Sequence, residues 1–135
     1  MTNTHRRRTL RGALVAALLT AVATPALAAC PAKAPKMKWN IHSGDQRVNA
    51  AYLQGLLPGK KVEYRGYGTE VYGADGSYSY VMKGETHKAP AYRFYADGTR
   101  CIDYPTPRFD LYVVNDRTLI LVNVHGFRGE GILRR

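Results

Sequence analysis

The chain has 135 residues, with 20 Lys and Arg against 10 Asp and Glu, and therefore a formal net charge of +10. This length suits a single domain, and the two cysteines allow one internal disulfide at most, so a multidomain chain and a disulfide-dense scaffold are excluded. The positive charge favours solubility and weak attraction to anionic surfaces, and the 10 tyrosines favour strands.

The first 29 residues have the pattern of a secretory signal peptide. Residues 1–12 contain four arginines and no acid, residues 13–29 contain no charge, and Ala26-Leu27-Ala28 forms a small-residue cleavage site. The longest uninterrupted apolar run, residues 13–19, is short of the ~20 apolar residues that cross a bilayer. The stretch HRRRTLR is similar to the twin-arginine export signal, and the general and twin-arginine routes both stay open. We therefore expect an exported protein, located in the periplasm or attached to a membrane by lipid.

Cys30 follows this leader directly, and the sequence predicts two alternative fates for it. The stretch LAAC, residues 27–30, resembles the lipobox of bacterial lipoproteins, which implies a Cys30 acylated on its sulfur and its amino group. The alternative is cleavage before Ala29 and a disulfide with Cys101, which an oxidising compartment permits. The two fates use the same sulfur and exclude each other. We favour lipidation. In that case residues 30–44 form a Pro/Lys-rich tether, and Cys101 is a buried thiol.

Residues 45–135 are expected to form one domain that opens with a short helix. Ser43 and Asp45 are candidate N-caps. Apolar and small residues then recur at spacings of three and four and form one stripe, made of Val48, Ala51, Tyr52, Gly55 and Leu56. Pro58 and Gly59 end the pattern. This helix is expected to lie across a sheet or to plug one end of a barrel.

From Lys60 onward the pattern changes to short alternating runs separated by turn residues. We predict strands near residues 60–66, 69–74, 77–83, 91–96, 99–104, 108–114 and 117–124. Asp-Gly pairs mark hairpins at 73–76 and 96–98, and Asn115-Asp116 marks a third. The stretch GETHKAP, residues 84–90, is interpreted as a polar loop, and residues 125–135 as a loosely held tail. The predicted fold is mainly β: one short N-terminal helix packed on an antiparallel meander of about seven strands, in a curved sheet or small barrel.

Residues 56–116 resemble a family of small exported bacterial proteins of unknown function, of which the domain called DUF995 is the nearest. The shared features are the start LLPGKKV, the Asp-Gly turns and the late strand DGTRC. In that family the late cysteine often has a partner further along the chain, whereas here Cys101 is the last cysteine. The resemblance implies export and no particular activity.

The sequence offers no group of residues with catalytic or metal-binding spacing. The histidines His42, His87 and His125 are scattered, and phosphate-loop, G-x-S-x-G and H-E-x-x-H motifs do not occur. Cys101 and Asp103 share one face of a strand, but nothing places His87 beside them as a base. We therefore predict no catalytic residue, no metal site and no cofactor.

Tyrosines and arginines on the predicted sheet are the most suggestive remaining feature. Tyrosine anchors contacts at a low cost in side-chain entropy, and arginine adds positive charge. We expect the tyrosines to be exposed and one face of the sheet to bind an anionic or sugar-like ligand. The candidate residues are Tyr64, Tyr78, Tyr80, Arg93, Tyr95 and Arg100.

These observations favour a non-catalytic exported envelope protein, a lipid-anchored binding or structural module that uses a Tyr/Arg-rich sheet face. Its expected partner is a component of the bacterial envelope or another envelope protein, and not a nucleic acid; acylation of Cys30 would add the membrane. The first alternative is a secreted, disulfide-containing, inhibitor-like β-barrel, although a positive charge opposes binding to a basic enzyme. A small hydrolase that uses Cys101 or a histidine is the third hypothesis.

Overall fold

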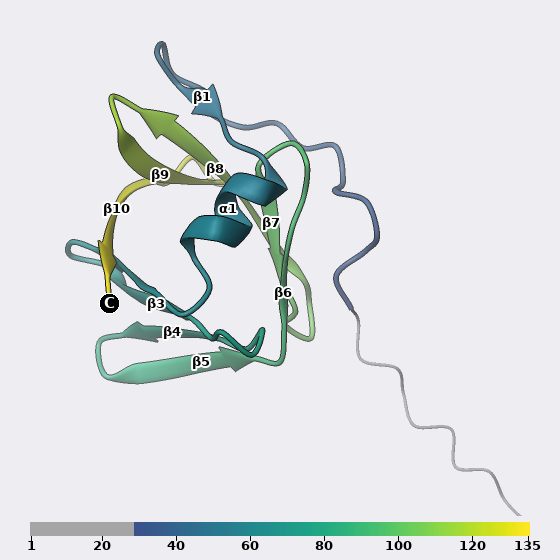
Figure 1. Ribbon diagram of the computed structural model, residues 1–135, viewed down its shortest axis with the longest axis vertical. Coiled ribbons are helices and arrows are strands. Elements are labelled where there is room, and N and C mark those ends of the chain that lie inside the picture. Colours follow the sequence, from purple (N-terminus) through teal and green to yellow (C-terminus); the bar gives the residue numbers. More distant parts are fainter. Residues whose placement is uncertain (1–28) are drawn as a thin grey trace, which may run out of the picture.

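The computed structural model describes residues 29–135, so the predicted signal peptide lies outside the described residues except for Ala29. The described chain contains ten strands and one helix (Figure 1). The first elements are β1 (Gln46–Arg47), α1 (Ala50–Leu56), β2 (Lys61–Tyr64), β3 (Gly68–Tyr72), β4 (Tyr78–Met82) and β5 (Glu85–Ala89). The remaining strands are β6 (Tyr92–Phe94), β7 (Thr99–Ile102), β8 (Arg108–Asn115), β9 (Thr118–Asn123) and β10 (Arg128–Arg134).

The strands form one antiparallel sheet that curls into a nearly closed barrel. Their order is β5-β4-β3-β2-β10-β9-β8-β7-β6, and β1 pairs with β8 outside this path. Figure 1 looks onto the end of the barrel that α1 covers, and the strands surround the helix in this view. The predicted fold class, a helix packed on an antiparallel β-meander, is confirmed, with more strands than expected.

The predicted hairpins form because the turn residues reach positive φ. Gly76 and Gly98 have φ values of +90° and +85°, a region that glycine enters without steric cost. Asp75 stabilises the first turn because its carboxylate accepts hydrogen bonds from the backbone N–H and the hydroxyl of Ser77, at 3.0 and 2.6 Å. The third hairpin turns at Asp116 and Arg117, one residue later than predicted.

Two segments predicted to be irregular are strands. Residues 85–89 of the expected polar loop form β5, which pairs with β4 from Tyr78 to Met82. Most of β5 is exposed on both faces, so it lacks the alternation that identifies a half-buried strand. The expected loose tail contains β10, whose glycines interrupt the same pattern.

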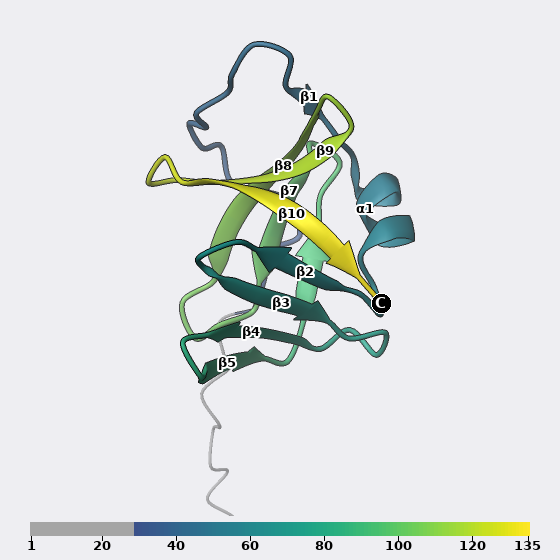
Figure 2. The same cartoon turned by 90° about the vertical axis from the view of Figure 1, so that its left-hand side faces the viewer.

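β10 joins the two halves of the sheet. Its first half, Arg128 to Gly131, pairs with β9, and its second half, Ile132 to Arg134, pairs with β2 (Figure 2). A Cβ atom on Gly131 would lie 2.8 Å from Val62 Cγ1, and one on Gly129 would lie 2.9 Å from Tyr64 Cδ1. Glycine at both positions therefore lets β10 pass close to side chains of β2.

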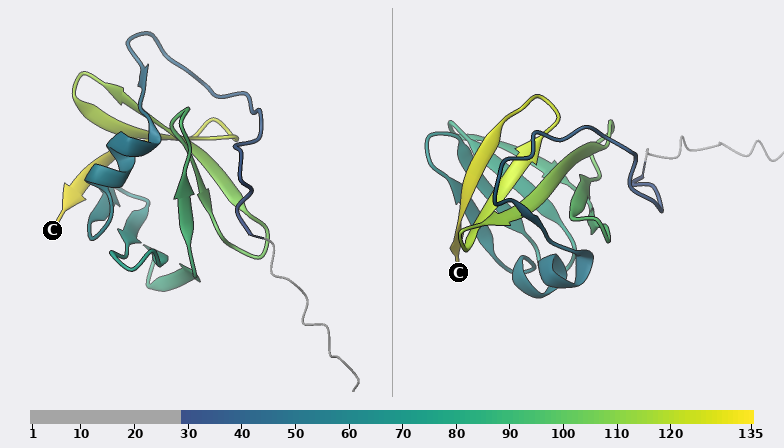
Figure 3. Two further views of the ribbon diagram at one scale, coloured as in Figure 1. Left: turned by 45° about the vertical axis from the view of Figure 1, so that its right-hand side comes forward. Right: turned by 90° about the horizontal axis from the view of Figure 1, so that it is seen from above.

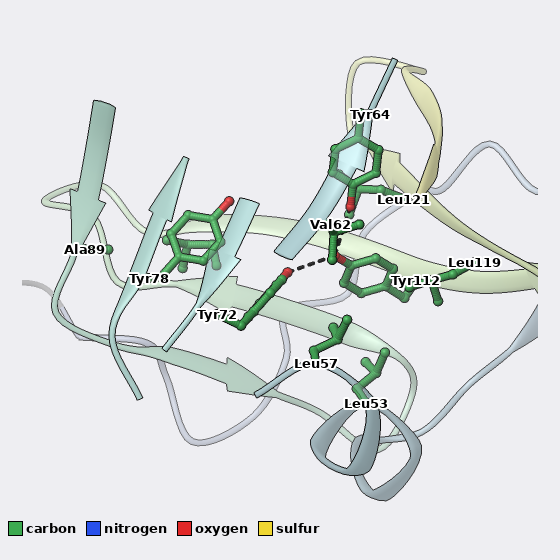
Figure 4. Packing of buried hydrophobic residues seen from close by; sticks show 11 residues of the cluster. Leu53, Leu57, Val62, Tyr64, Tyr72, Tyr78, Ala89, Tyr112, Leu119 and Leu121 are labelled. Carbon is green, nitrogen blue, oxygen red and sulfur yellow. Dashed lines mark hydrogen bonds between the residues drawn. The ribbon is translucent and has the colours of Figure 1, made fainter. Parts of the chain in front are cut away.

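The core has two parts because β8 and β9 are buried on both faces. Tyr112, Leu119 and Leu121 point into the barrel, where Figure 4 shows them beside Tyr64 and Tyr72. The outward-facing part consists of Leu111, Val113, Ile120 and Val122, with Trp39 packed against it. The alternation of residues 108–113 predicts that Leu111 and Val113 lie on the face opposite Tyr112, and the structure confirms it.

α1 is shorter than predicted and has a different cap. The Asn49 side chain accepts a hydrogen bond from the backbone N–H of Tyr52 at 2.8 Å, so Asn49 is the N-cap and the prediction of Ser43 or Asp45 is wrong. Leu53 and Leu57 are fully buried in the barrel core. The helix thus closes one end of the barrel, while the β4–β5 turn and the β7–β8 loop lie at the other end (Figures 2 and 3).

The segment 30–44, predicted as a tether, contacts the domain at several points. The structure joins Cys30 to Cys101 by a disulfide across a sequence separation of 71. The carbonyl of Pro31 accepts hydrogen bonds from Arg93 Nη1 and the Tyr95 hydroxyl, at 2.9 and 2.7 Å. With Trp39 on the outer core, the segment is fastened to the outside of the sheet.

Candidate functional site

The interior of the barrel contains a charged cluster whose residues come from separate stretches of the sequence. Arg100 on β7 is 0% exposed, as is Asp110 on β8, and Glu70 on β3 is 2% exposed. Four tyrosines enclose these charges, and we call the seven residues the buried cluster: Tyr64, Glu70, Tyr72, Tyr78, Arg100, Asp110 and Tyr112.

Ion pairs hold the centre of the buried cluster. Arg100 Nη2 lies 2.5 Å from Glu70 Oε1 and 3.0 Å from Asp110 Oδ2. Asp110 also accepts hydrogen bonds from Arg108 Nε and Nη2, at 3.0 and 3.1 Å to its two oxygens. Two guanidinium groups thus face two carboxylates. This balance matters because an unpaired charge is very costly in a barrel interior.

The tyrosine hydroxyls complete the surroundings of Glu70. Tyr78 donates to Oε1 at 2.8 Å, and Tyr64 and Tyr112 donate to Oε2 at 2.9 Å each. Burial by itself would raise the pKa of Glu70, but the charge and hydrogen bond of Arg100, together with the hydrogen bonds from Tyr78 and Tyr112, outweigh it and hold the pKa below its ordinary value. Burial raises the pKa of each of the tyrosines well above its usual range, so they stay protonated as donors.

The faces of the tyrosine rings also enclose Arg100. Its Cζ atom lies 5.3 to 5.8 Å from the ring centroids of Tyr72, Tyr78 and Tyr112, which is the geometry of cation–π contacts. Arg100 Nη1 additionally donates to the hydroxyl of Tyr72. The polar groups of the buried cluster thus find their hydrogen-bond partners largely among themselves.

The structure separates the six predicted binding residues into three places. Tyr64, Tyr78 and Arg100 belong to the buried cluster, so the expectation that they form an exposed face is wrong. Tyr95 is also buried, and Arg93 beside it is exposed; both bind the carbonyl of Pro31 on the outside of the sheet. Curling the sheet places one of its faces inside, and residue alternation alone does not reveal which face that is.

Tyr80 remains as the predicted residue that lines an open cavity. A cavity of about 550 Å³ lies between the β4–β5 hairpin and the β7–β8 loop, the segments found at the end of the barrel opposite α1. We call it the mouth, and it is lined by Tyr80, Met82, His87, Tyr104, Pro105, Thr106 and Arg108. Its volume is typical of a site for a small molecule.

The buried cluster positions two side chains of the mouth. The Tyr104 ring packs edge-on against Tyr78, with 6.2 Å between their centroids. The Arg108 side chain is 41% exposed, and its guanidinium donates a hydrogen bond to the buried Asp110. The mouth therefore presents a fixed guanidinium beside aromatic rings; its Nε and Nη2 are bound to Asp110, and its Nη1 forms no hydrogen bond within the described residues. Sequence reasoning did not select Tyr104 and Arg108 as binding residues, although the Pro105-Thr106-Pro107 corner between them was the available signal.

The cysteines and histidines form no reactive group in the described part of the chain. Cys101 is bonded to Cys30 and has no free thiol, so the arrangement of Cys101, His87 and Asp103 considered above lacks its nucleophile. Within residues 29–135 no three His, Cys, Asp or Glu side chains are placed to hold a metal ion. A helix long and apolar enough to cross a membrane does not occur in that range either.

The fold and the mouth together define a class: a small barrel-like β-protein with a helix at one end, a cavity at the other and a charged cluster between them. Comparisons with protein-family models, curated proteins and solved structures found no match for this chain. The resemblance to the DUF995 family stays a prediction, and function is inferred from the geometry.

Proposed function

We propose that the protein is a non-catalytic exported module of the bacterial envelope that binds an anionic saccharide at the mouth. The observation that carries the proposal is the position of Arg108. Its side chain is half-exposed in the mouth, and its guanidinium forms an ion pair with the buried Asp110. Asp110 uses Nε and Nη2 of this guanidinium, so Nη1 is the donor that is left for a carboxylate or phosphate group of a ligand. No rearrangement of the mouth is then needed for binding.

The aromatic side chains favour a sugar as the ligand body. Tyr80 and Tyr104 line the same cavity as Arg108, and an aromatic ring offers an apolar face together with a polar edge. Their hydroxyls are uncharged donors at neutral pH, because tyrosine ordinarily ionises near pH 10 and burial raises the pKa of both side chains further. Together with Thr106 and His87 they offer polar groups around a ring-sized ligand.

We infer that the exported form carries the Cys30–Cys101 disulfide instead of a lipid. A sulfur bonded to Cys101 cannot also carry a thioether-linked acyl group, and the segment after Cys30 is fastened to the sheet through Pro31 and Trp39. Cleavage before Ala29 is consistent with this form. Intact-mass spectrometry of the protein from cells separates the two fates: we expect an unmodified Ala29 and two fewer hydrogens than the reduced chain, whereas an acylated Cys30 contradicts the inference.

The experiment for the saccharide site uses the oxidised mature protein and isothermal titration calorimetry. Trigalacturonate serves as the acidic probe, and neutral maltotriose tests the need for charge. We expect binding of the acidic probe and at least about a tenfold loss of affinity in Tyr80→Ala and in Arg108→Gln, since a lost charged hydrogen bond costs about 1.5–3 kcal/mol.

Arg93→Gln is the matched control because Arg93 is exposed and lies away from the mouth lining. Circular dichroism and thermal unfolding verify that each variant folds. Equal affinity of the wild type and the two mouth variants for trigalacturonate, or equal binding of maltotriose, would contradict the proposal.

A further inference from the structure

A second cavity lies beside β10, away from the mouth. Its volume is about 610 Å³, and β10, β9, the end of β2 and α1 all contribute to its lining. Figure 2 looks onto this side of the molecule, where β10 crosses the view between the two halves of the sheet. We call this cavity the β10 groove.

The β10 groove exists because β10 changes partners halfway along its length. Arg128 to Gly131 pair with β9, and Ile132 to Arg134 pair with β2. Neither neighbour follows β10 over its whole length, so space opens beside the strand where each pairing stops. The groove therefore lies where β10 changes its pairing partner from β9 to β2, which is also where the barrel closes.

Apolar side chains gather in the β10 groove although they are accessible to water. Tyr52, Tyr67 and Leu133 are 47%, 56% and 37% exposed and all line it. They are three of the six large apolar side chains exposed within residues 29–135. Scattered exposed apolar residues are ordinary, whereas a grouped set in a concavity indicates a binding site.

Positive charge accompanies this apolar surface. Arg65, Arg117 and Arg128 line the groove, and Glu130 is its only acidic lining residue. Arg128 is already held by both oxygens of Asp45, at 2.9 Å each. Arg65 and Arg117 are exposed, and neither forms an ion pair within the described chain. Two arginines are thus available to an anion.

We propose that the β10 groove binds one molecule of an anionic amphiphile, a single acyl chain with a phosphate or carboxylate head. The chain covers Tyr52 and Leu133, whose exposed apolar surface leaves water on binding. The head group pairs with Arg65 or Arg117, and charge complementarity selects an anion over a neutral amphiphile. This site shares no lining residue with the mouth, so the proposal does not depend on the saccharide proposal.

The test measures binding of dodecyl phosphate below its micelle concentration to the oxidised mature protein, with neutral dodecyl maltoside and inorganic phosphate as comparisons. We expect saturable one-to-one binding of dodecyl phosphate, at least tenfold weaker binding of the maltoside, and weaker binding still of inorganic phosphate. The double variant Arg65→Gln/Arg117→Gln should lose at least tenfold in affinity for dodecyl phosphate. Leu133→Ser should weaken binding of both amphiphiles.

Arg93→Gln and Lys88→Gln are the matched controls, because they remove exposed charge elsewhere and should leave binding unchanged. Equal losses in these controls would show nonspecific attraction to a basic protein and overturn the proposal. Equal binding of dodecyl phosphate and dodecyl maltoside would also overturn it. So would association with phosphatidylglycerol vesicles without saturable binding of monomeric dodecyl phosphate, since that result assigns the surface to a membrane.

Discussion

Glu70 is the residue at which the buried cluster becomes sensitive to pH. Burial opposes its charge, but Arg100 and the hydroxyls of Tyr78 and Tyr112 hold its pKa below the ordinary carboxyl value of about 4.3. A carboxyl group with a lowered pKa in the folded protein contributes stability above its unfolded pKa and loses that contribution as the pH falls. The interior ion pairs are therefore strongest at neutral pH.

We predict that the free energy of unfolding falls as the pH is lowered from about 5 through the unfolded carboxyl pKa near 4.3. Glu70→Gln should be less stable than the wild type at pH 7 and should show a flatter pH dependence. Urea unfolding at pH 7, 5, 4 and 3 measures both effects. Asp45→Asn is the comparison, because Arg128 hydrogen bonds also lower the pKa of Asp45 outside the barrel. Parallel curves for the wild type and Glu70→Gln would contradict the prediction.

Side-chain alternation predicted part of this residue-scale picture. It placed Tyr112 and Asp110 opposite Leu111 on β8, as the structure confirms. It could not predict that Arg100 meets Glu70, because β7 and β3 lie far apart in the strand order and meet only when the sheet curls. Charged residues are also rarely buried, so Arg100 was interpreted as part of an exposed surface.

At the scale of elements, the strands with turn signals and alternation were predictable, and β5 and β10 were not. β5 is exposed on nearly all its residues, so its strand conformation depends on pairing with β4 and leaves no hydrophobic pattern. β10 contains Gly129 and Gly131, which reduce strand propensity when considered alone. The close approach to β2 explains both glycines, but it is a property of the closed barrel and not of the local sequence.

A pair of glycine substitutions tests this explanation. Gly131→Ala should destabilise the protein by about 1–3 kcal/mol, because its Cβ would meet Cγ1 of the fully buried Val62 at 2.8 Å. Gly55→Ala is the matched change in α1, where nothing lies within 4 Å of the added atom. It should stabilise by about 0.5–1 kcal/mol through helix propensity. Chemical unfolding measures both, and equal effects of the two substitutions would sink the explanation.

At the scale of the whole molecule, the disulfide determines whether residues 30–44 belong to the folded unit. It connects Cys30 with a fully buried Cys101 on β7, 71 positions later in the chain. Two cysteines in an exported chain made this pairing one of two predictions. Trp39 was expected to pack on a core because it is a large apolar residue, and it does so. The contacts of Pro31 with the sheet were not foreseen, since a Pro/Lys-rich segment carries no folding pattern of its own.

We predict that removing the disulfide by Cys30→Ala/Cys101→Ala lowers the free energy of unfolding by about 2–5 kcal/mol, in line with a long closed loop. Urea unfolding followed by fluorescence of Trp39, the single tryptophan, measures this effect. The wild type under reducing conditions should give a similar value. A loss below about 1 kcal/mol in both experiments would show that the bridge adds little to the folded state.

The pairing of β10 with both β9 and β2 also determines when the protein can fold. β10 is the element that pairs with both β2 and β9, and it follows them in the chain. A chain that emerges from a ribosome or translocation channel amino end first exposes two incomplete half-sheets until residues 128–134 are released. Each half-sheet then carries an open edge that is prone to self-association. A chaperone that shields the nascent chain would therefore be needed up to that moment and dispensable afterwards.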